Sequence, residues 1–262
     1  MDISFVILTW NSKAHITKCV ESIVASIRDG YRYEIFIIDN GSIDGTVNLL
    51  KQFEKKYDNI VKPIYLDINT GTTYSRNMAL RKCAGKYIVV LDSDVEIYDS
   101  TIPNLVAELE KDAAVGMVVP KLLYGSGLLQ KSTDSFPTIW RKFARYFFLK
   151  SMEKRQQSQA GIDGTVDVDY AISAFWMMRS EILGAVGLLD EKIFYAPEDV
   201  DYCLRIWKAG YGIKYVPKAY ATHYAQEISR GFKINKATIQ HVKGLIYFFR
   251  KHGYIFTKPD FY

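Results

Sequence analysis

The sequence predicts an α/β protein with a mainly parallel sheet and helices on both faces. Apolar runs typical of strands alternate with segments whose apolar residues recur at helical spacing, through about the first hundred residues. The run "YIVVL" is continuous rather than alternating, as expected of a strand covered on both faces. Strand and helix in alternation favour right-handed crossovers and therefore parallel strands.

The first half supplies four strands and three helices. We predict strands at 3–8, 34–38, 60–66 and 87–91. A first helix follows Ser12, which can cap it, and carries apolar residues at helical spacing from Ile16 to Ile27. The turn "DNGSIDGT" precedes a second helix, with Ser42 or Asp44 as its cap, and the loop "DINTGTT" precedes a third that ends near Lys82.

The second half is less regular. A short helix after Pro103 leads to the strand "VGMVVP" and a "GSG" turn. Residues 151–165 lack apolar periodicity, which predicts a mobile loop. The segment "VDVDYAISAFWMMRSE" and the acidic turn "FYAPEDVDYCLRIWKAGY" follow, then a strand at 212–216 and a basic, aromatic helix at 236–251.

Composition bounds the cellular setting and the partners. The chain has 262 residues, 48% of them hydrophobic, which suffices for one large core with an appended C-terminal element. No apolar run has the length of a membrane span, and three distant cysteines suggest neither a disulfide framework nor a zinc site. We therefore expect a cytoplasmic protein. The net charge of +5 suits anionic small molecules or an anionic membrane surface, and we expect no nucleic-acid partner.

Polar residues follow each of the first four strands. They are Thr9 and Asn11, then Asp39 and Asn40, then the segment 69–73, and finally Asp92 and Asp94. Because the carboxyl ends of parallel strands share one edge of a sheet, these residues are expected to line a single crevice. Taken alone, this stretch has the alternative interpretation of solvated loop acids or a helix cap, which is the less favoured of the two.

The residue types in this crevice suit a nucleotide and a cation. Asp39 suits a hydrogen bond to a nucleobase or ribose, and Arg76 suits a pyrophosphate, although a lone arginine on a helix is more often a solvated surface residue. The pair Asp92 and Asp94 suits a hard divalent cation. No glycine-rich loop follows the first strand, which argues against a Rossmann dehydrogenase and a P-loop NTPase.

Five ordered motifs carry a family resemblance. The stretches "FVILTWNS", "IIDNGSIDGT", "NTGTTYSRNMAL", "YIVVLDSDVEI" and "APEDVDYCLRIWKAGY" resemble the family-2 inverting glycosyltransferases of the GT-A fold. This resemblance implies a catalytic domain at 1–225, with a nucleotide-sugar-binding half at 1–98, an acceptor-side half at 99–225, and a helical extension at 226–262. It also implies a Mn²⁺ or Mg²⁺ cofactor.

The resemblance also assigns roles by position. It makes Thr9, Asn11, Asp39 and Arg76 contacts of the nucleotide, Asp92 a contact on the ribose or metal side, and Asp94 a metal ligand. It makes Asp199 the general base. His223 matches a histidine that binds the metal in several relatives, and its alternative is a structural histidine.

The donor and acceptor follow from narrower likenesses. The stretches "EDVDYCLR", "GYGIKYVPKAYATH" and "SRGF" look most like bacterial rhamnosyltransferases of surface polysaccharide synthesis, which implies a dTDP-rhamnose donor. A UDP-hexose or UDP-N-acetylhexosamine donor is the alternative, and the acceptor is expected to be a saccharide or a lipid-linked saccharide. The rival functions are a nucleotidyltransferase and a non-catalytic subunit that binds sugar nucleotides or polysaccharide. The aromatic, basic segment 138–150 suits either core packing or contact with the inner face of the cell membrane.

Overall fold

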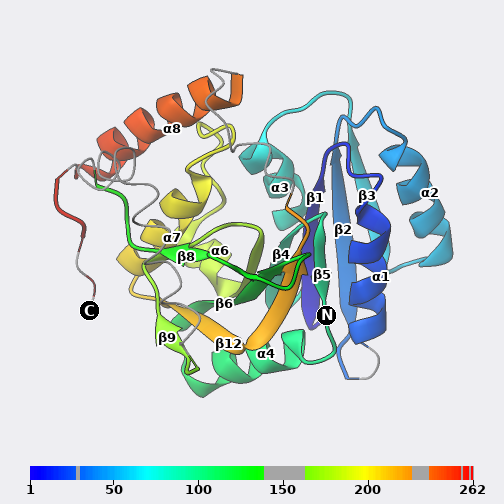
Figure 1. Cartoon of the computed structure of the whole chain (residues 1–262), viewed down its shortest axis with the longest axis horizontal. Helices are drawn as coiled ribbons and strands as arrows, with labels where there is room; N and C mark the ends of the chain where they lie inside the picture. The colour runs from blue at the N-terminus through cyan, green and yellow to red at the C-terminus, as the bar shows by residue number, and fades with distance from the viewer. Residues whose placement is uncertain (28–29, 139–162, 226–235, 255, 260, 262) are drawn as a thin grey trace.

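The computed structural model describes residues 1–27, 30–138, 163–225, 236–254, 256–259 and 261. A twisted sheet runs through the molecule, with helices packed on both of its faces (Figure 1). Three predicted features lie wholly or mostly outside the described residues: residues 139–150 of the aromatic, basic segment 138–150, most of the predicted loop 151–165, and the "SRGF" motif. Among the described residues, no helix combines the length and the apolarity needed to cross a membrane.

The first half of the chain forms the parallel part of the sheet. Strand β1 (Ile3–Thr9) pairs in parallel with β2 (Tyr33–Asn40) and β4 (Tyr87–Asp92), and β2 pairs in parallel with β3 (Val61–Leu66). All four strands were predicted to within one or two residues of their ends. Their connections are the helices α1 (Ile16–Ser26), α2 (Thr46–Lys56) and α3 (Thr72–Leu80).

The second half extends the sheet with strands of mixed direction. The order across the sheet is β3-β2-β1-β4-β11-β6-β12-β5. The remaining elements are β5 (Val95–Ile97), α4 (Thr101–Lys111), β6 (Val115–Tyr124), β7 (Leu129–Gln130), β8 (Thr133–Asp134), β9 (Val166–Asp167), β10 (Tyr170–Ala171), β11 (Phe175–Arg179), α6 (Glu181–Val186), α7 (Glu198–Lys208), β12 (Gly212–His223) and α8 (Lys236–His252).

Two hydrophobic cores lie on opposite faces of the sheet. Alternate residues of one strand enter different cores: Phe5 and Ile7 of β1 belong to the first, and Val6 belongs to the second. Helices α1, α2 and α4 bury their apolar faces in the first core, whereas α3, α6, α7 and α8 contribute to the second. Burial on both faces explains why the strands read as continuous apolar runs.

Two local expectations turn out differently. The predicted cap at Ser12 is wrong, because α1 begins at Ile16 and the Ser12 hydroxyl accepts a hydrogen bond from Ser93 at 2.7 Å instead. The predicted cap of α2 at Ser42 or Asp44 is also wrong, because the N-cap is Gly45; the Asp44 carboxylate precedes it and accepts the N–H of Thr46, the first residue of α2, at 2.9 Å. The Ser12 hydroxyl therefore ties the end of β1 to the loop after β4.

Candidate active site

Two carboxylates stand at the carboxyl end of the central parallel strands. Asp92 is the last residue of β4 and faces Leu8 of β1 in the strand register. Asp94 lies two residues later, just before β5. Their side chains are 36% and 21% exposed, respectively, so both are open to a ligand while the rest of β4 is buried.

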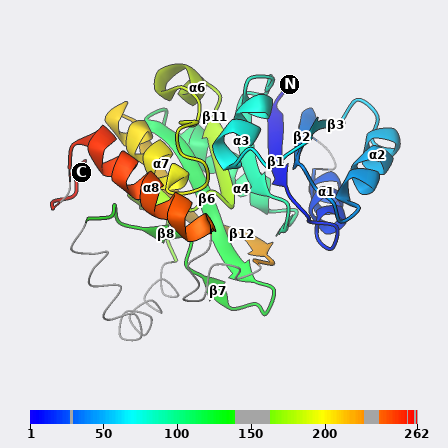
Figure 2. The ribbon, with the colours of Figure 1, turned by 90° about the horizontal axis from the view of Figure 1, so that it is seen from above.

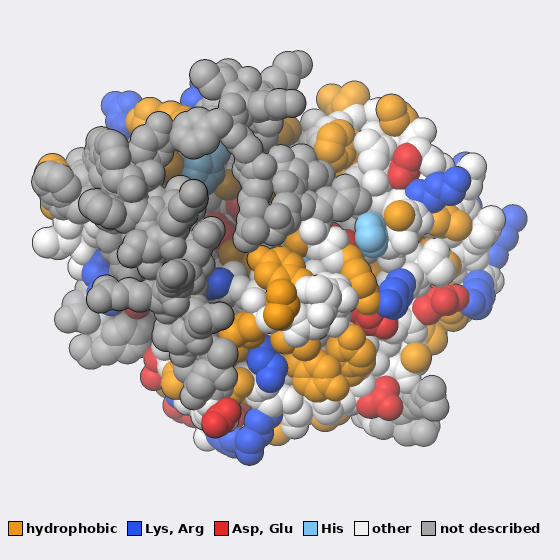
Figure 3. Space-filling model, in the orientation of Figure 1, with side chains coloured by type: hydrophobic (Ala, Val, Ile, Leu, Met, Phe, Trp, Pro, Cys, Tyr) orange, Lys and Arg blue, Asp and Glu red, His pale blue; other side chains and the backbone are white. Residues whose placement is uncertain are grey.

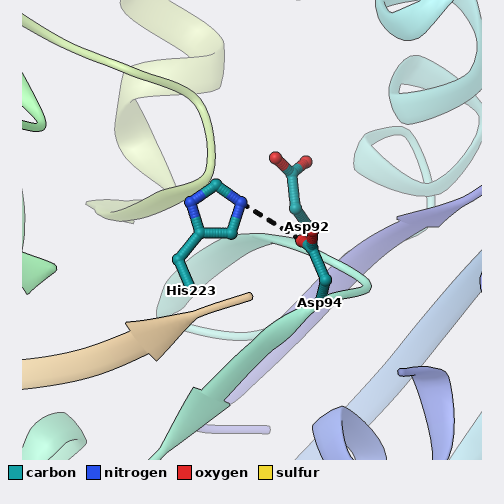
Figure 4. A group of neighbouring side chains, drawn as sticks. All are labelled: Asp92, Asp94 and His223. Atoms are coloured by element: carbon teal, nitrogen blue, oxygen red, sulfur yellow. Dashed lines mark ion pairs between the residues drawn. The ribbon is translucent and has the colours of Figure 1, made fainter. Parts of the chain in front are cut away.

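A histidine from a distant strand completes a cluster with these carboxylates. Asp92, Asp94 and His223 each offer one ligand atom, and the three atoms lie within 4.8 Å of one another. The His223 ring turns one nitrogen toward Asp94 (Figure 4), with Nε2 at 3.2 Å from the Asp94 Oδ1 atom. Two carboxylate oxygens and one imidazole nitrogen form a donor set that fits Mn²⁺ or Mg²⁺.

Gln130 holds the other side of the His223 ring. Its Oε1 atom lies 2.9 Å from His223 Nδ1 and accepts a hydrogen bond from that nitrogen when Nδ1 is protonated. This leaves Nε2 as the nitrogen that faces Asp94. Burial lowers the pKa of His223, but the hydrogen bond that its ring donates to Asp94 and the charges of Asp94 and Asp92 outweigh it and raise the pKa overall.

Arg76 connects the metal-side carboxylates to the second half of the chain. Its side chain is 1% exposed, so the alternative of a solvated surface arginine is wrong. Its Nη2 atom donates to Asp92 Oδ1 at 2.6 Å and to the Ser173 carbonyl at 3.0 Å. Its Nη1 atom lies 3.8 Å from Glu198 Oε1. The buried guanidinium of Arg76 thus lies between the end of β4 and the start of α7.

The acidic pair Glu198 and Asp199 begins α7. Glu198 is 6% exposed and accepts a hydrogen bond from the Ser173 hydroxyl at 2.8 Å. Burial and the charge of Asp199 raise the pKa of Glu198 to about 8, against the opposing charge of Arg76. Asp199 is more accessible than Glu198, and its carboxylate accepts the N–H of Val200 at 2.8 Å. The raised pKa favours the protonated form of Glu198 at neutral pH.

The ends of β1 and β2 present buried polar atoms beside this cluster. Thr9 and Asp39 face one another in the strand register, and each is 1% exposed. The Ser42 N–H donates to Asp39 Oδ2 at 3.0 Å. Within the described residues, Thr9 Oγ1 and Asp39 Oδ1 are buried without a hydrogen-bond partner. Buried polar atoms are rarely left unpaired, so this pair of atoms points to a ligand that supplies a donor.

Asn11 and Asn40 hold the loops around this edge. Asn11 has a positive φ of 51°, and its side-chain oxygen accepts the N–H of Ile43 at 2.9 Å. Asn40 Oδ1 accepts the N–H of Thr70 at 2.8 Å. These contacts join the loops after β1, β2 and β3 to one another, and they place the predicted polar residues along one edge of the sheet.

The fold brings the predicted polar residues to one site, and two residues that were not predicted, Gln130 and Ser173, also contribute to it. Asp201 and Arg205 lie four residues apart on α7 and form an ion pair, with the Arg205 Nε atom 2.9 Å from Asp201 Oδ2. Gln130 and Ser173 had no signal in the sequence. They lie on a two-residue strand and in a turn, and their partners are 93 and 25 residues away.

Comparisons with known proteins identify a family and several similar chains. A family model described as "Glycosyl transferase family 2" matches residues 4–187. Glycosyltransferase AglE of Haloferax volcanii is 23% identical over 91% of this chain and 73% of its own length. The poly-beta-1,6-N-acetyl-D-glucosamine synthase of Staphylococcus epidermidis is 26% identical over 83% of this chain and 48% of its own.

A solved structure supports the fold independently of sequence. The crystal structure of GalNAc-T7 with UDP, GalNAc and Mn²⁺ superposes with a TM-score of 0.71 at 19% identity, over 95% of this chain and 48% of that one. The chain thus spans about half the length of two of these relatives. The likeness confirms the predicted GT-A type of α/β fold. The family match covers more than half of the chain, and the protein therefore belongs to glycosyl transferase family 2.

Proposed function

We propose that this protein is a metal-dependent, inverting glycosyltransferase that moves a sugar from a nucleoside diphosphate to a saccharide or lipid-linked saccharide during polysaccharide synthesis. The observation that carries the proposal is the cluster of Asp92, Asp94 and His223 at the carboxyl edge of the sheet. The unpartnered atoms of Thr9 and Asp39 support it at the neighbouring strand ends. A nucleoside diphosphate sugar needs both features. The cluster provides a metal site for its diphosphate, and the unpartnered atoms provide contacts for its nucleoside.

The metal in this proposal is held by Asp94 and His223, with Asp92 beside them. A bound divalent cation supplies positive charge for the diphosphate that leaves the sugar. Asp92 already shares a 2.6 Å ion pair with Arg76, so one of its oxygens is engaged by the protein. We therefore assign the direct contacts to Asp94 and His223, and to Asp92 a contact on the ribose or metal side.

The nucleoside contacts follow from the two unpartnered atoms. Asp39 Oδ1 is an acceptor and fits the ring N–H of uracil or thymine, while the Thr9 hydroxyl fits a carbonyl or hydroxyl of the nucleoside. Asn11 offers its Nδ2 group to a ligand, while its oxygen already accepts the N–H of Ile43. The guanidinium of Arg76 also has two buried nitrogens without a hydrogen-bond partner in the described residues, and it adds positive charge near the diphosphate.

Asp199 is the general base in this proposal. Inversion requires a group that accepts the proton of the acceptor hydroxyl as that hydroxyl attacks the face opposite the leaving group. Glu198 is the poorer candidate, because its pKa is raised to about 8 and its oxygen is held by Ser173. Asp199 is the more accessible of the two, and its carboxylate accepts the N–H of Val200 beside it.

Two classes of donor fit the proposed site. The motif likeness favours dTDP-rhamnose. A UDP-N-acetylhexosamine is favoured instead by the similar structure that contains UDP and GalNAc and by the similar poly-beta-1,6-N-acetyl-D-glucosamine synthase. Calorimetric titration of the full chain tests the choice of donor directly. The titrants are dTDP-rhamnose, a UDP-N-acetylhexosamine, UDP-glucose and free UDP, each with and without Mn²⁺. Binding that needs Mn²⁺, followed by release of the nucleoside diphosphate, supports the proposal. Binding without turnover toward any saccharide acceptor would favour a non-catalytic sugar-nucleotide subunit.

We also propose that the outer face of α8 contacts an anionic membrane that carries the acceptor. Val242 and Ile246 are half exposed on that face, and Lys243 and Arg250 flank them. No acidic residue occurs from 236 to 259, which suits an anionic surface. Sedimentation with phosphatidylglycerol vesicles at low salt tests the contact, and protein that stays in the supernatant would refute it.

A further inference from the structure

The segment 188–197 leads directly into the acidic pair at the start of α7. Helix α3 is hydrogen-bonded to one side of this segment. The Thr72 N–H donates to the Phe194 carbonyl at 2.7 Å, and the Thr73 hydroxyl donates to the Ile193 carbonyl at 2.7 Å. Asn77 donates to the Leu189 carbonyl at 2.9 Å and accepts its N–H at 3.1 Å. The segment is thereby fixed to the helix that carries Arg76.

Helix α8 approaches the same segment from the other side. Gly244 is buried in the middle of α8, and a Cβ atom added there would lie 2.1 Å from the Ala196 carbonyl oxygen and 3.0 Å from Pro197 Cδ. Glycine destabilises a helix interior relative to alanine. Its presence here is explained by this close approach, which only a residue without a side chain permits.

Two more side chains of α8 reach this segment. The Tyr247 hydroxyl donates to Asp190 Oδ2 at 2.8 Å, and Lys251 donates to the same oxygen at 2.6 Å. Residues 244, 247 and 251 are three and seven positions apart and therefore share one face of the helix. Phe248, on that face as well, is fully buried in the core. Figures 1 and 2 both show α8 alongside α7.

We propose that α8 is a positioning element for the general base. The helix contacts the segment 188–197 through Gly244, Tyr247 and Lys251, while α3 holds the other side of that segment. These contacts fix where α7 begins and where Asp199 presents its carboxylate. Both helices act through contacts with one segment, so the base is held relative to Arg76 and Asp92. The role of Asp199 rests on the function proposed above, whereas the contact itself does not. Helix α8 lies outside the residues matched by the family model.

Hydrogen exchange tests the contact without any substrate. We compare the full chain with its Gly244→Ala and Gly184→Ala variants by mass spectrometry. Gly184 is a matched control, because it also lies in a helix but an added Cβ there meets nothing within 4 Å. Gly244→Ala should speed exchange at least tenfold over 188–201 and leave β1 and β4 unchanged. The same exchange in 188–201 for all three proteins would overturn the proposal.

Kinetics separate positioning from general stability. A displacement of about 1 Å at a reacting group costs up to about 10²-fold in rate, so Gly244→Ala should lower kcat about 10- to 100-fold. The dissociation constant for UDP with Mn²⁺ should stay within twofold, because none of its proposed contacts lies on α8 or in the segment 188–197: they lie on β1, β2, α3, β4 and β12 and in the turns after β1 and β4. Gly184→Ala should match the wild type in both measurements. Equal loss of UDP binding and kcat would overturn the positioning role.

A milder variant decides the matter if Gly244→Ala does not fold. Tyr247→Phe removes only the hydroxyl that bonds Asp190 and keeps the ring. It should speed exchange over 188–197 and lower kcat about threefold at an unchanged dissociation constant for UDP. Unchanged exchange and kcat would overturn the proposal. If wild-type protein turns over none of the donors, the proposed function fails, and the exchange comparison still decides whether α8 holds this segment.

Discussion

Arg76 shows how one residue can join two halves of a site. Its ion pair with Asp92 at 2.6 Å and its approach to Glu198 at 3.8 Å link the end of β4 to the start of α7. A buried arginine requires nearby acids, because an uncompensated charge in the core is costly. The motif "NTGTTYSRNMAL" predicted the residue, but not that Glu198 would be its second partner, since 122 residues separate the two in the sequence (198 − 76).

At the same scale, Gln130 should control the affinity of the cation site. Gln130→Leu removes the acceptor for His223 Nδ1 and should weaken Mn²⁺ binding about tenfold, in the range typical of residues that orient a metal ligand. Electron paramagnetic resonance titration of Mn²⁺ measures this. Gln130→Glu keeps an acceptor and should retain the affinity, whereas Asp94→Asn should abolish binding. An unchanged Mn²⁺ affinity for Gln130→Leu would contradict the orienting role.

Asp199 and Glu198 should respond very differently to the loss of a carboxylate. Asp199→Asn keeps the shape and removes the proton acceptor, so transfer should fall about 10²- to 10⁴-fold while binding of UDP with Mn²⁺ persists. Glu198→Gln should cost far less, because the pKa of Glu198 near 8 keeps it mostly protonated at pH 7 and glutamine resembles that form. Steady-state assays of both variants check this, and a larger loss for Glu198→Gln would reverse the assignment.

Among the elements, the parallel strands were predictable and the inserted strands were not. Strands β1, β2 and β4 are apolar throughout because both faces are covered, and this leaves a plain local signal. Strand β11 enters between β4 and β6 in the antiparallel sense, and no local pattern encodes that position. Strand β12 was predicted only to 216, because Pro217 and Lys218 interrupt its pattern where the register shifts.

The contact between α7 and α8 predicts a dependence of stability on pH. Burial raises the pKa of Asp201, but hydrogen bonds from His252 and Lys251 and the charges of Arg205 and Lys251 outweigh it and lower the pKa to about 2. The folded value lies below the ordinary value of 3.8, so the stabilisation is complete above that value and is lost as the pH falls toward 2. The difference corresponds to about 2 kcal/mol of unfolding free energy.

The matching experiment compares urea unfolding of the wild type and Asp201→Asn from pH 6 to pH 2. The wild type should be more stable at pH 6, and the difference between the two proteins should shrink by about 2 kcal/mol as the pH falls through about 4 to 2. Glu110→Gln is a suitable control, because that carboxylate is half exposed and its salt bridge with Lys86 lies on the surface. A difference that stays constant with pH would contradict the role of Asp201.

For the whole molecule, the alternation of strands and helices predicted that the site lies at the carboxyl edge of the sheet. It did not predict that β12 would reach that edge. Thr9, Asp39, Asp92 and Asp94 each follow an apolar run, so the topology alone brings them to one edge. His223 reaches them only because β12 continues past its irregular centre. Charged side chains of both signs are interspersed over the described part of the face in Figure 3, which agrees with the modest net charge. Such a surface suits a small anionic donor better than a polyanion.

The whole arrangement predicts the stereochemistry of the product. Retention would require a carboxylate that attacks the sugar and forms a covalent intermediate, and inversion requires only a base on the side away from the leaving group. Within the described residues, Glu198 is the second acid beside Asp199, and it is 6% exposed, hydrogen-bonded to Ser173 and raised in pKa to about 8. Glu198 is therefore a poor nucleophile. The route that we expect is a single displacement, in which the acceptor hydroxyl attacks the sugar directly.

We accordingly expect a donor with an α-linked sugar to give a β-linked product, and a β-linked donor to give an α-linked product. Proton NMR of the anomeric signal, recorded early in the reaction with the donor found by titration, measures this through the coupling constant of a hexose such as glucose or N-acetylglucosamine. The Asp199→Asn variant should give the same anomer at a lower rate, because the base accepts a proton and does not bond the sugar. A product with the configuration of the donor would show that a side chain attacks the sugar first, and it would shift the central role to Glu198.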